Sequence, residues 1–160
     1  MVGTDLYVAD TGNNVIRKIE TDNSFNTTTL TGPGPGDPAF GYADGTSASA
    51  LFHGPRGVDS DGTDLFVTDA GNRAIRKVAI SDGTTSTVRR GSTGSSPFVA
   101  LHGVTTDGTY LYVADASGAV IRKVEIAGGS EPVLAGLEDT PGSVDGTCAS
   151  ARFEYPVGIT

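Results

Sequence analysis

The two histidines, His53 and His102, are the side chains best suited to acid–base or metal chemistry near neutral pH. They do not occupy equivalent positions of the internal repeat described below. A metal site needs three or four suitable ligands, and the sequence places no such set beside either histidine. It also contains no Gly-x-Ser-x-Gly nucleophile motif and no phosphate-binding loop. The sequence therefore predicts no catalytic residue, no metal site and no cofactor.

A unit made of an apolar run, a turn and a half-basic run occurs three times, at 6–19, 65–78 and 111–124. The apolar run, such as Leu-Tyr-Val-Ala-Asp, predicts a strand covered on both faces. The second run, such as Val-Ile-Arg-Lys, predicts a strand whose Arg and Lys stems lie along the sheet with their charged heads in water. Weaker strands follow all three pairs and precede the second and third. Each unit is thus predicted to be a four-stranded antiparallel blade of a β-propeller, in an all-β chain with three blades.

An aspartate ends the apolar run of every unit, at Asp10, Asp69 and Asp115. A carboxylate needed once for chemistry has no reason to recur in each blade. Carboxylates at turns commonly accept hydrogen bonds from nearby backbone N–H groups. We therefore expect these three residues to have a structural role in turns.

The repeated motif resembles the NHL repeat family, and the resemblance covers essentially the whole chain. The residues that carry it most clearly are Pro55-Arg56-Gly57-Val58, Leu65 to Asp69, Gly71-Asn72 and Ile75-Arg76-Lys77. The third copy departs from the motif, with Ser117-Gly118 in place of Gly-Asn. The resemblance implies a propeller used mainly as a binding scaffold, with a few enzymes among the relatives.

Composition limits the partners that the chain can take. Its 160 residues include 23 glycines, and its net charge of −8 opposes binding to a nucleic-acid backbone. No apolar run is long enough for a transmembrane helix, so no membrane association is expected. Met1 to Asp5 lead directly into the first strand, so no signal peptide is expected, and the compartment stays open. The single cysteine, Cys148, permits no internal disulfide bond.

We interpret residues 1–160 as one propeller segment that begins inside a blade. The predicted blades span about 5–32, 56–91 and 102–136. The first lacks an innermost strand, and the chain closes with a sequence that matches an innermost strand. Those closing residues are Pro156, Val157, Gly158, Ile159 and Thr160. When the end of the sequence is joined to its beginning, the repeat continues without a gap, so the chain corresponds to three whole blades.

The closing strand is predicted to complete the first blade of a second copy. Propellers have about four to eight blades, so three blades are too few to close a ring. Two chains that exchange their closing strands give six blades in a head-to-tail homodimer. An open monomeric arc is the alternative, and it would expose apolar faces and an unpaired edge.

Two long connections, 32–52 and 136–153, are predicted to lie on the same face as the Asp-x-Gly-Asn turns. Arg56, His102 and Val157 each precede the glycine of an innermost strand, so they are predicted to surround the channel mouth on that face. They could hold a protein, a peptide or a small anionic ligand. A non-catalytic, self-assembling scaffold is the main hypothesis. The alternative is a lyase- or lactonase-type propeller enzyme that uses His102 as acid, base or ligand.

Overall fold

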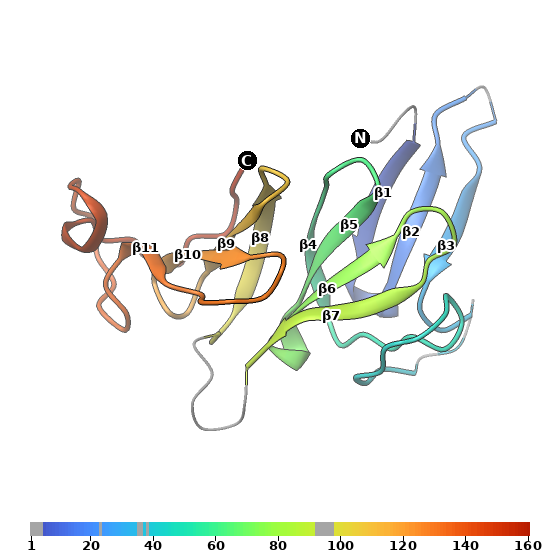
Figure 1. Cartoon of the computed structure of the whole chain (residues 1–160), viewed down its shortest axis with the longest axis horizontal. Coiled ribbons are helices and arrows are strands. Elements are labelled where there is room, and N and C mark those ends of the chain that lie inside the picture. The colour runs from blue at the N-terminus through green and yellow to red at the C-terminus, as the bar shows by residue number, and fades with distance from the viewer. Residues whose placement is uncertain (1–4, 23, 35–36, 38, 92–97) are drawn as a thin grey trace.

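The computed structural model describes residues 5–22, 24–34, 37, 39–91 and 98–160. Three antiparallel sheets stand side by side in chain order, as Figure 1 shows from β1 to β11. This all-β arrangement is consistent with a propeller-like fold. The predicted junction of Thr160 with Met1 to Thr4 involves residues outside the described part of the chain. No helix among the described residues has the length and apolar character needed to cross a membrane.

Each sheet is one predicted blade, and its strands follow one another from the inner to the outer edge. Blade 1 contains β1 (Asp5–Asp10), β2 (Val15–Glu20) and β3 (Thr27–Thr31). Blade 2 contains β4 (Pro55–Ser60), β5 (Asp64–Asp69), β6 (Ala74–Ala79) and β7 (Thr85–Arg90). Blade 3 contains β8 (Leu101–Thr106), β9 (Tyr110–Asp115), β10 (Val120–Glu125) and β11 (Val133–Gly136). Short 3-10 turns occur at η1 (Thr11–Asn13), η2 (Ala70–Asn72) and η3 (Cys148–Ser150).

The two central strands of each blade pair in the same register. The aspartate at the end of the first strand faces the first residue of the second, as in Asp69↔Ala74 and Asp115↔Val120. Blade 1 repeats this pairing as Asp10↔Val15. The sequence repeat therefore corresponds to a repeat of backbone geometry. A residue in one blade can be compared directly with its counterpart in the next.

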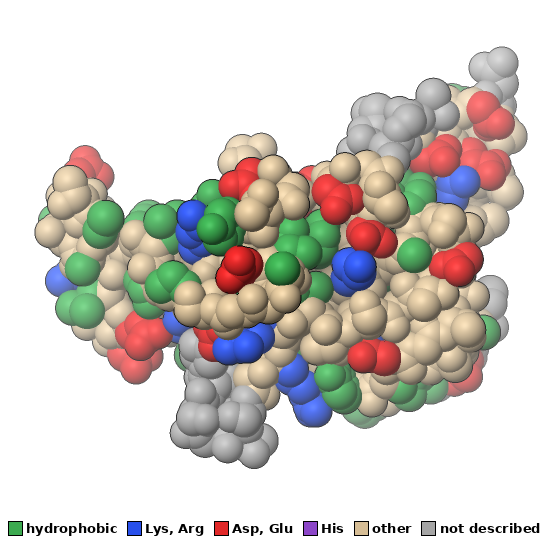
Figure 2. All heavy atoms as spheres, in the orientation of Figure 1, with side chains coloured by type: hydrophobic (Ala, Val, Ile, Leu, Met, Phe, Trp, Pro, Cys, Tyr) green, Lys and Arg blue, Asp and Glu red, His purple; other side chains and the backbone are tan. Residues whose placement is uncertain are grey.

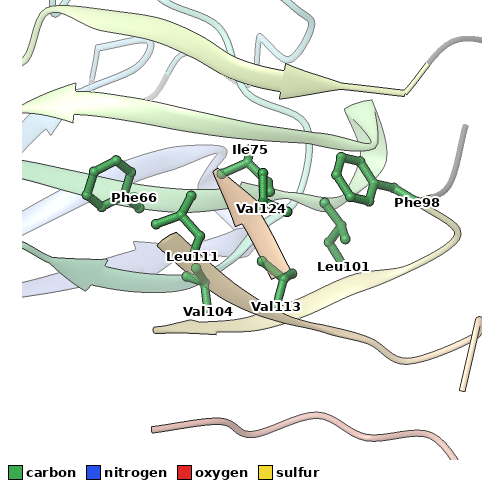
Figure 3. Close-up of a cluster of buried hydrophobic side chains, with 8 residues drawn as sticks. All are labelled: Phe66, Ile75, Phe98, Leu101, Val104, Leu111, Val113 and Val124. Carbon is green, nitrogen blue, oxygen red and sulfur yellow. The ribbon is translucent and has the colours of Figure 1, made fainter. Parts of the chain in front are cut away.

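Two apolar clusters fill the spaces between neighbouring blades. Figure 3 shows the cluster between blades 2 and 3, in which Phe66 and Ile75 meet Leu111 and Val124. The cluster between blades 1 and 2 contains Ile16, Phe52, Leu65, Val67 and Val78, among others. The apolar runs of blades 2 and 3 are covered on both faces, as their near-continuous pattern predicts.

The prediction that the repeated arginines keep their charged heads in water is wrong for blades 2 and 3. Arg76 is 0% exposed and Arg122 is 2% exposed. Both guanidinium groups are buried because carboxylates from other segments pair with them, as described below. The neighbouring lysine of blade 2 does reach solvent, since the Lys77 side chain is 41% exposed.

In the described part of the chain, blade 1 has three strands, and no described segment covers the face of β1 that points away from blade 2. Leu6 and Val8 on this face are 38% and 41% exposed. Their counterparts in blade 2, Leu65 and Val67, are 1% and 0% exposed. The same apolar pattern is therefore buried in one blade and open to water in the other.

Residues 156–160 lie beside β8 and form no strand within the single chain. The N–H of Gly103 donates a hydrogen bond of 2.8 Å to the carbonyl of Val157. A Cβ on Gly103 would lie 2.6 Å from that carbonyl oxygen, and a Cβ on Gly57 would meet the carbonyl oxygen of His102 in the same way. The closing segment is thus related to β8 as β8 is related to β4, in the position of the next innermost strand.

Candidate functional site

The first insert, defined here as the described residues between 39 and 54, folds back onto blade 2. A bridge between Ala43 and Leu51 closes it into a hairpin-like loop. It contacts the η2 turn, because the Gly71 N–H donates to the His53 carbonyl at 2.8 Å and the Asn72 amide donates to the Gly41 carbonyl at 2.6 Å. The insert and the Asp-x-Gly-Asn turn therefore lie together on one face. The residues 35, 36 and 38 of the predicted connection lie outside the described chain.

The guanidinium of Arg76 is enclosed by acceptors from blade 2 and from the first insert. It pairs with Asp69 at 2.9 Å and with Asp44 at 2.8 Å. It also donates to the carbonyl of Leu51 at 2.9 Å and to the carbonyl of Ala43 at 2.6 Å. The two terminal nitrogens make all of these contacts, and Nε is buried without a partner. A buried arginine charge is tolerated only when carboxylates and carbonyls surround it in this way. The ion pairs therefore hold the insert on the blade.

Asp69 links the strand, the turn and the insert. Its carboxylate accepts a hydrogen bond from the His53 N–H at 2.8 Å and from the Asn72 side-chain amide at 2.7 Å. Burial raises the pKa of Asp69, and the hydrogen bonds from Asn72, the His53 N–H and Arg76 oppose that rise. The structure thus gives this residue more than the turn role that its repetition suggested.

Blade 3 forms a related cluster with different segments. Arg122 pairs with Asp115 at 3.0 Å and with Glu138 at 2.7 Å. Asp115 also accepts a hydrogen bond from the Ala100 N–H at 2.8 Å. The connection before this blade is short and provides no counterpart of Asp44, and Glu138 from the following connection supplies the second carboxylate. Residues 92–97 of the connection before blade 3 lie outside the described chain.

The predicted channel-mouth residues Arg56 and His102 contact each other. The Arg56 guanidinium donates to the His102 imidazole. The Tyr155 hydroxyl lies 3.3 Å from Nε2 of His102, and the two rings meet edge to face with centroids 5.4 Å apart. Val157, the equivalent residue of the closing segment, lies beside Gly103 and is 49% exposed. These residues offer one cation, one imidazole and one hydroxyl to a ligand at the inner edge of the blades.

Burial lowers the pKa of His102 from its ordinary value of 6.5, and the positive charge of Arg56 lowers it further. A neutral imidazole can accept the hydrogen bond from Arg56 through the ring nitrogen that carries no proton. The cluster is therefore suited to recognise an anion through Arg56 rather than through a protonated histidine. Among the described residues, no group of three or more His, Cys, Asp or Glu side chains is placed to hold a metal ion.

Sequence reasoning missed Tyr155 and the two carboxylates Asp44 and Glu138. Tyr155 stands where the first insert has Gly54, so the repeat gives no signal for it. Asp44 does recur as Asp145, and that recurrence could have shown that it has a defined partner. Glu138 has no counterpart in the first insert, so only the folded chain shows its role.

No family model and no curated protein matches the chain. Solved structures do match. A structural genomics protein of unknown function from Bacteroides thetaiotaomicron superposes with a TM-score of 0.71 at 20% identity, over 97% of this chain and 38% of that one. The nidogen/laminin complex gives 0.63 at 19% identity, over 87% and 46%. An auxiliary nutrient binding protein from Bacteroides thetaiotaomicron gives 0.59 at 20% identity, over 70% and 32%.

These similarities show the fold alone, because every identity is low. They agree with the propeller-like arrangement of the sheets. The chain spans less than half of the length of each of these structures.

Proposed function

We propose that the chain is a non-catalytic, NHL-type propeller scaffold that assembles by exchanging residues 156–160 between two copies. The closing segment of each copy pairs with β1 of the other, and two chains form a ring of six blades. We call each of the two joints a seam. The observation that carries the proposal is the exposure of Leu6 and Val8, whose counterparts in blade 2 are fully buried.

The open surface of blade 1 is the acceptor. Strand β1 pairs with β2 on one side only, whereas β5 and β9 pair on both sides. Its free edge is an unpaired row of backbone donors and acceptors, which readily binds another strand. The exposed Leu6 and Val8 add an apolar surface beside that edge.

The closing segment is the donor. It lies beside β8, where the Gly103 N–H donates to the Val157 carbonyl, and no strand among the described residues pairs with it in a sheet. A Cβ on Gly158 would have no atom within 4 Å, although the equivalent glycines, Gly57 and Gly103, pack against backbone. The surface at Gly158 is therefore open in the single chain, whereas the equivalent surfaces at Gly57 and Gly103 are packed against the next segment.

The occupant that fits both open surfaces is a second copy of the chain. Residues 156–160 match the start of β4, which pairs with β5, and β1 matches β5. By this register Ile159 of one copy faces Val8 of the other, as Val58 faces Val67 in blade 2. The contact joins two different surfaces, the closing segment of one copy and β1 of the other. Two copies close a ring of six blades, a number within the usual range for propellers.

The insert-bearing face is the proposed binding face of the assembled scaffold. The ring brings Arg56, His102 and Val157 of both copies around one channel mouth. A doubled set of arginines on a rim favours a carboxylate-bearing peptide or a small anionic molecule. Loops on one face of a repeat protein are the usual place for such recognition.

The mass of the chain in dilute solution tests the assembly. The full chain is expected to have twice the 16.3 kDa mass of one chain by light scattering coupled to size exclusion. A chain that ends at Tyr155 is expected to keep its β-sheet circular dichroism spectrum and to lose the dimer.

A full chain that stays monomeric at micromolar concentration would contradict the proposal. The open surfaces would then belong to further blades of a longer polypeptide. A truncated chain that still dimerises would assign the contact to another surface.

A further inference from the structure

The second insert, defined here as residues 140–155, has the same backbone arrangement as the first insert. Its residues follow their counterparts by 101 positions, as Asp145 follows Asp44. The bridge Ala43↔Leu51 recurs as Val144↔Arg152. The loop is therefore already folded before any partner binds.

Two further features confirm that the two inserts share one conformation. The hydrogen bond from the Gly41 N–H to the Phe52 carbonyl recurs between Gly142 and Phe153, and both are 3.0 Å long. Gly54 has a φ of 62°, and its counterpart Tyr155 has a φ of 54° although it is not a glycine. A non-glycine residue in this region is uncommon, so the shared φ indicates that both inserts end in the same turn.

Among the described residues, no sheet follows the second insert in its own chain, so it has no next blade to cover as the first insert covers blade 2. Phe52 of the first insert is fully buried between blades, whereas Phe153 is only partly buried. Val144 is 55% exposed, and Asp145 is exposed as well. Figure 1 shows this segment at the left end of the chain, far from β1 to β3, and Figure 2 shows exposed hydrophobic side chains at the same end.

Blade 1 carries an unoccupied copy of the surface that receives the first insert. On blade 2, Asp44 pairs with Arg76 and accepts hydrogen bonds from the N–H and the hydroxyl of Thr87. In blade 1, Arg17 faces Thr29 across β2 and β3, as Arg76 faces Thr87 across β6 and β7.

The remaining parts of this surface also recur. Asp10 is bonded to the amide of Asn13, as Asp69 is bonded to that of Asn72. No carboxylate among the described residues lies within ion-pair distance of Arg17, whereas Arg76 and Arg122 each pair with two. The Nε atoms of Arg17 and Arg76 are both buried without a hydrogen-bond partner, so the missing ion pairs alone distinguish Arg17 from Arg76. Blade 1 therefore has the cation and lacks the insert that neutralises it.

We infer that Asp145 of one copy forms an ion pair with Arg17 of the other and so fixes the register of each seam. This inference rests on the proposed assembly and names its specificity contact. The second insert then covers blade 1 of the partner as the first insert covers blade 2. Asp145 takes the place of Asp44, and Phe153 takes the place of Phe52. The pair excludes slipped or alternative partners because any other placement leaves both charges unpaired.

Charge exchange between two variants tests the pair in trans. Arg17→Glu places a carboxylate opposite Asp145 at both seams of its homodimer, and Asp145→Arg places two cations there. Each variant alone is expected to dimerise at least about tenfold more weakly than the wild type. In an equimolar mixture, the heterodimer has one native seam and one reversed seam. Its affinity is expected to return to within a few-fold of the wild type.

The subunit composition is read by native mass spectrometry, with one variant carrying a small mass tag. Dissociation constants come from sedimentation velocity over a dilution series. Circular dichroism and thermal melting of each variant at low concentration verify that the single chain still folds. Arg17 lies on an open face, so the fold of the monomer is expected to tolerate its reversal.

The matched control is the pair that acts within one chain. Arg76→Glu and Asp44→Arg reverse an ion pair of the same type, and mixing these two variants is expected to rescue neither stability nor assembly.

The outcomes separate the inference from the proposed function. A monomeric wild type would overturn both. A dimeric wild type whose affinity is unchanged in Arg17→Glu and Asp145→Arg would overturn the ion pair and leave strand exchange in place. Weakened homodimers that are not rescued by mixing would also overturn it, since the two charges would then act separately.

Discussion

Replacing Asp69 with alanine is expected to lower the free energy of unfolding by about 3–5 kcal/mol, because it removes the buried carboxylate partner of Arg76 and leaves only the half-exposed Asp44. Arg76 is 0% exposed, so water cannot replace the lost carboxylate. The change also removes the acceptor for the His53 N–H and the Asn72 amide. Urea unfolding followed by circular dichroism, at a concentration where the chain is monomeric, measures the loss.

Asp82→Ala is the matched control for this prediction. Asp82 is an exposed turn residue whose carboxylate accepts a hydrogen bond of 2.8 Å from the Thr84 N–H. Its removal is expected to cost about 1 kcal/mol or less. If both alanine variants lost the same small amount, the buried ion pair would not be holding the first insert on blade 2.

Gly57→Ala and Gly158→Ala are expected to separate folding from assembly. The added methyl group at Gly57 meets the backbone carbonyl of His102 inside the chain, and a backbone atom cannot move aside easily. Overpacking of this kind costs about 1–3 kcal/mol. The added methyl at Gly158 meets nothing within 4 Å in the single chain, so the monomer should keep its stability.

In the dimer, the methyl group at Gly158 is expected to meet the backbone near Arg56 of the partner, by analogy with Gly57 and Gly103. A loss of about 1–3 kcal/mol at a seam corresponds to at least about fivefold weaker dimerisation. Unfolding curves measured at low concentration and sedimentation measured at high concentration give the two effects separately. Equal dimerisation of Gly158→Ala and wild type would contradict the proposed packing of the closing segment.

The repeat predicted the blades because local strand patterns and turn residues agree with the fold at every copy. The pairs Asp69↔Ala74 and Asp115↔Val120 lie in the same register because the spacing between the two runs is the same in each unit. Among the described residues, the first strand of blade 1 is β1, which matches β5 rather than β4.

The burial of the arginines could not be predicted from the repeat alone. Arg17, Arg76 and Arg122 have the same neighbours in sequence, and their environments differ only through segments distant in sequence. Asp44 comes from the connection before blade 2, and Glu138 comes from the connection after blade 3. A local pattern reports which side chains share a face, but it does not report which loop returns to cover them.

The contact of His102 with Tyr155 was beyond sequence reasoning for a related reason. Tyr155 has a left-handed φ of 54°, a conformation that its counterpart Gly54 adopts without strain. The repeat therefore suggests a glycine-like turn there and gives no signal for an aromatic hydroxyl near the channel mouth. The side chain reaches His102 only because blade 3 and the closing segment are adjacent in space.

Cross-linking of the seam tests the central claim most directly. With the exposed Cys148 replaced by serine, the double variant Val8→Cys, Ile159→Cys places two thiols opposite each other on neighbouring strands of different copies. Directly paired residues on antiparallel strands have Cα atoms about 4.5–5.5 Å apart, within the range for a disulfide bond. Val8→Cys with Thr160→Cys is the control, because a shift of one residue turns the second thiol to the opposite face.

Non-reducing denaturing electrophoresis after mild oxidation reads the result. The account predicts a covalent dimer for the Val8 and Ile159 pair and much less for the Val8 and Thr160 pair. A product that stays at the mass of one chain, or equal cross-linking of the two pairs, would contradict the exchange of the closing segment between two copies.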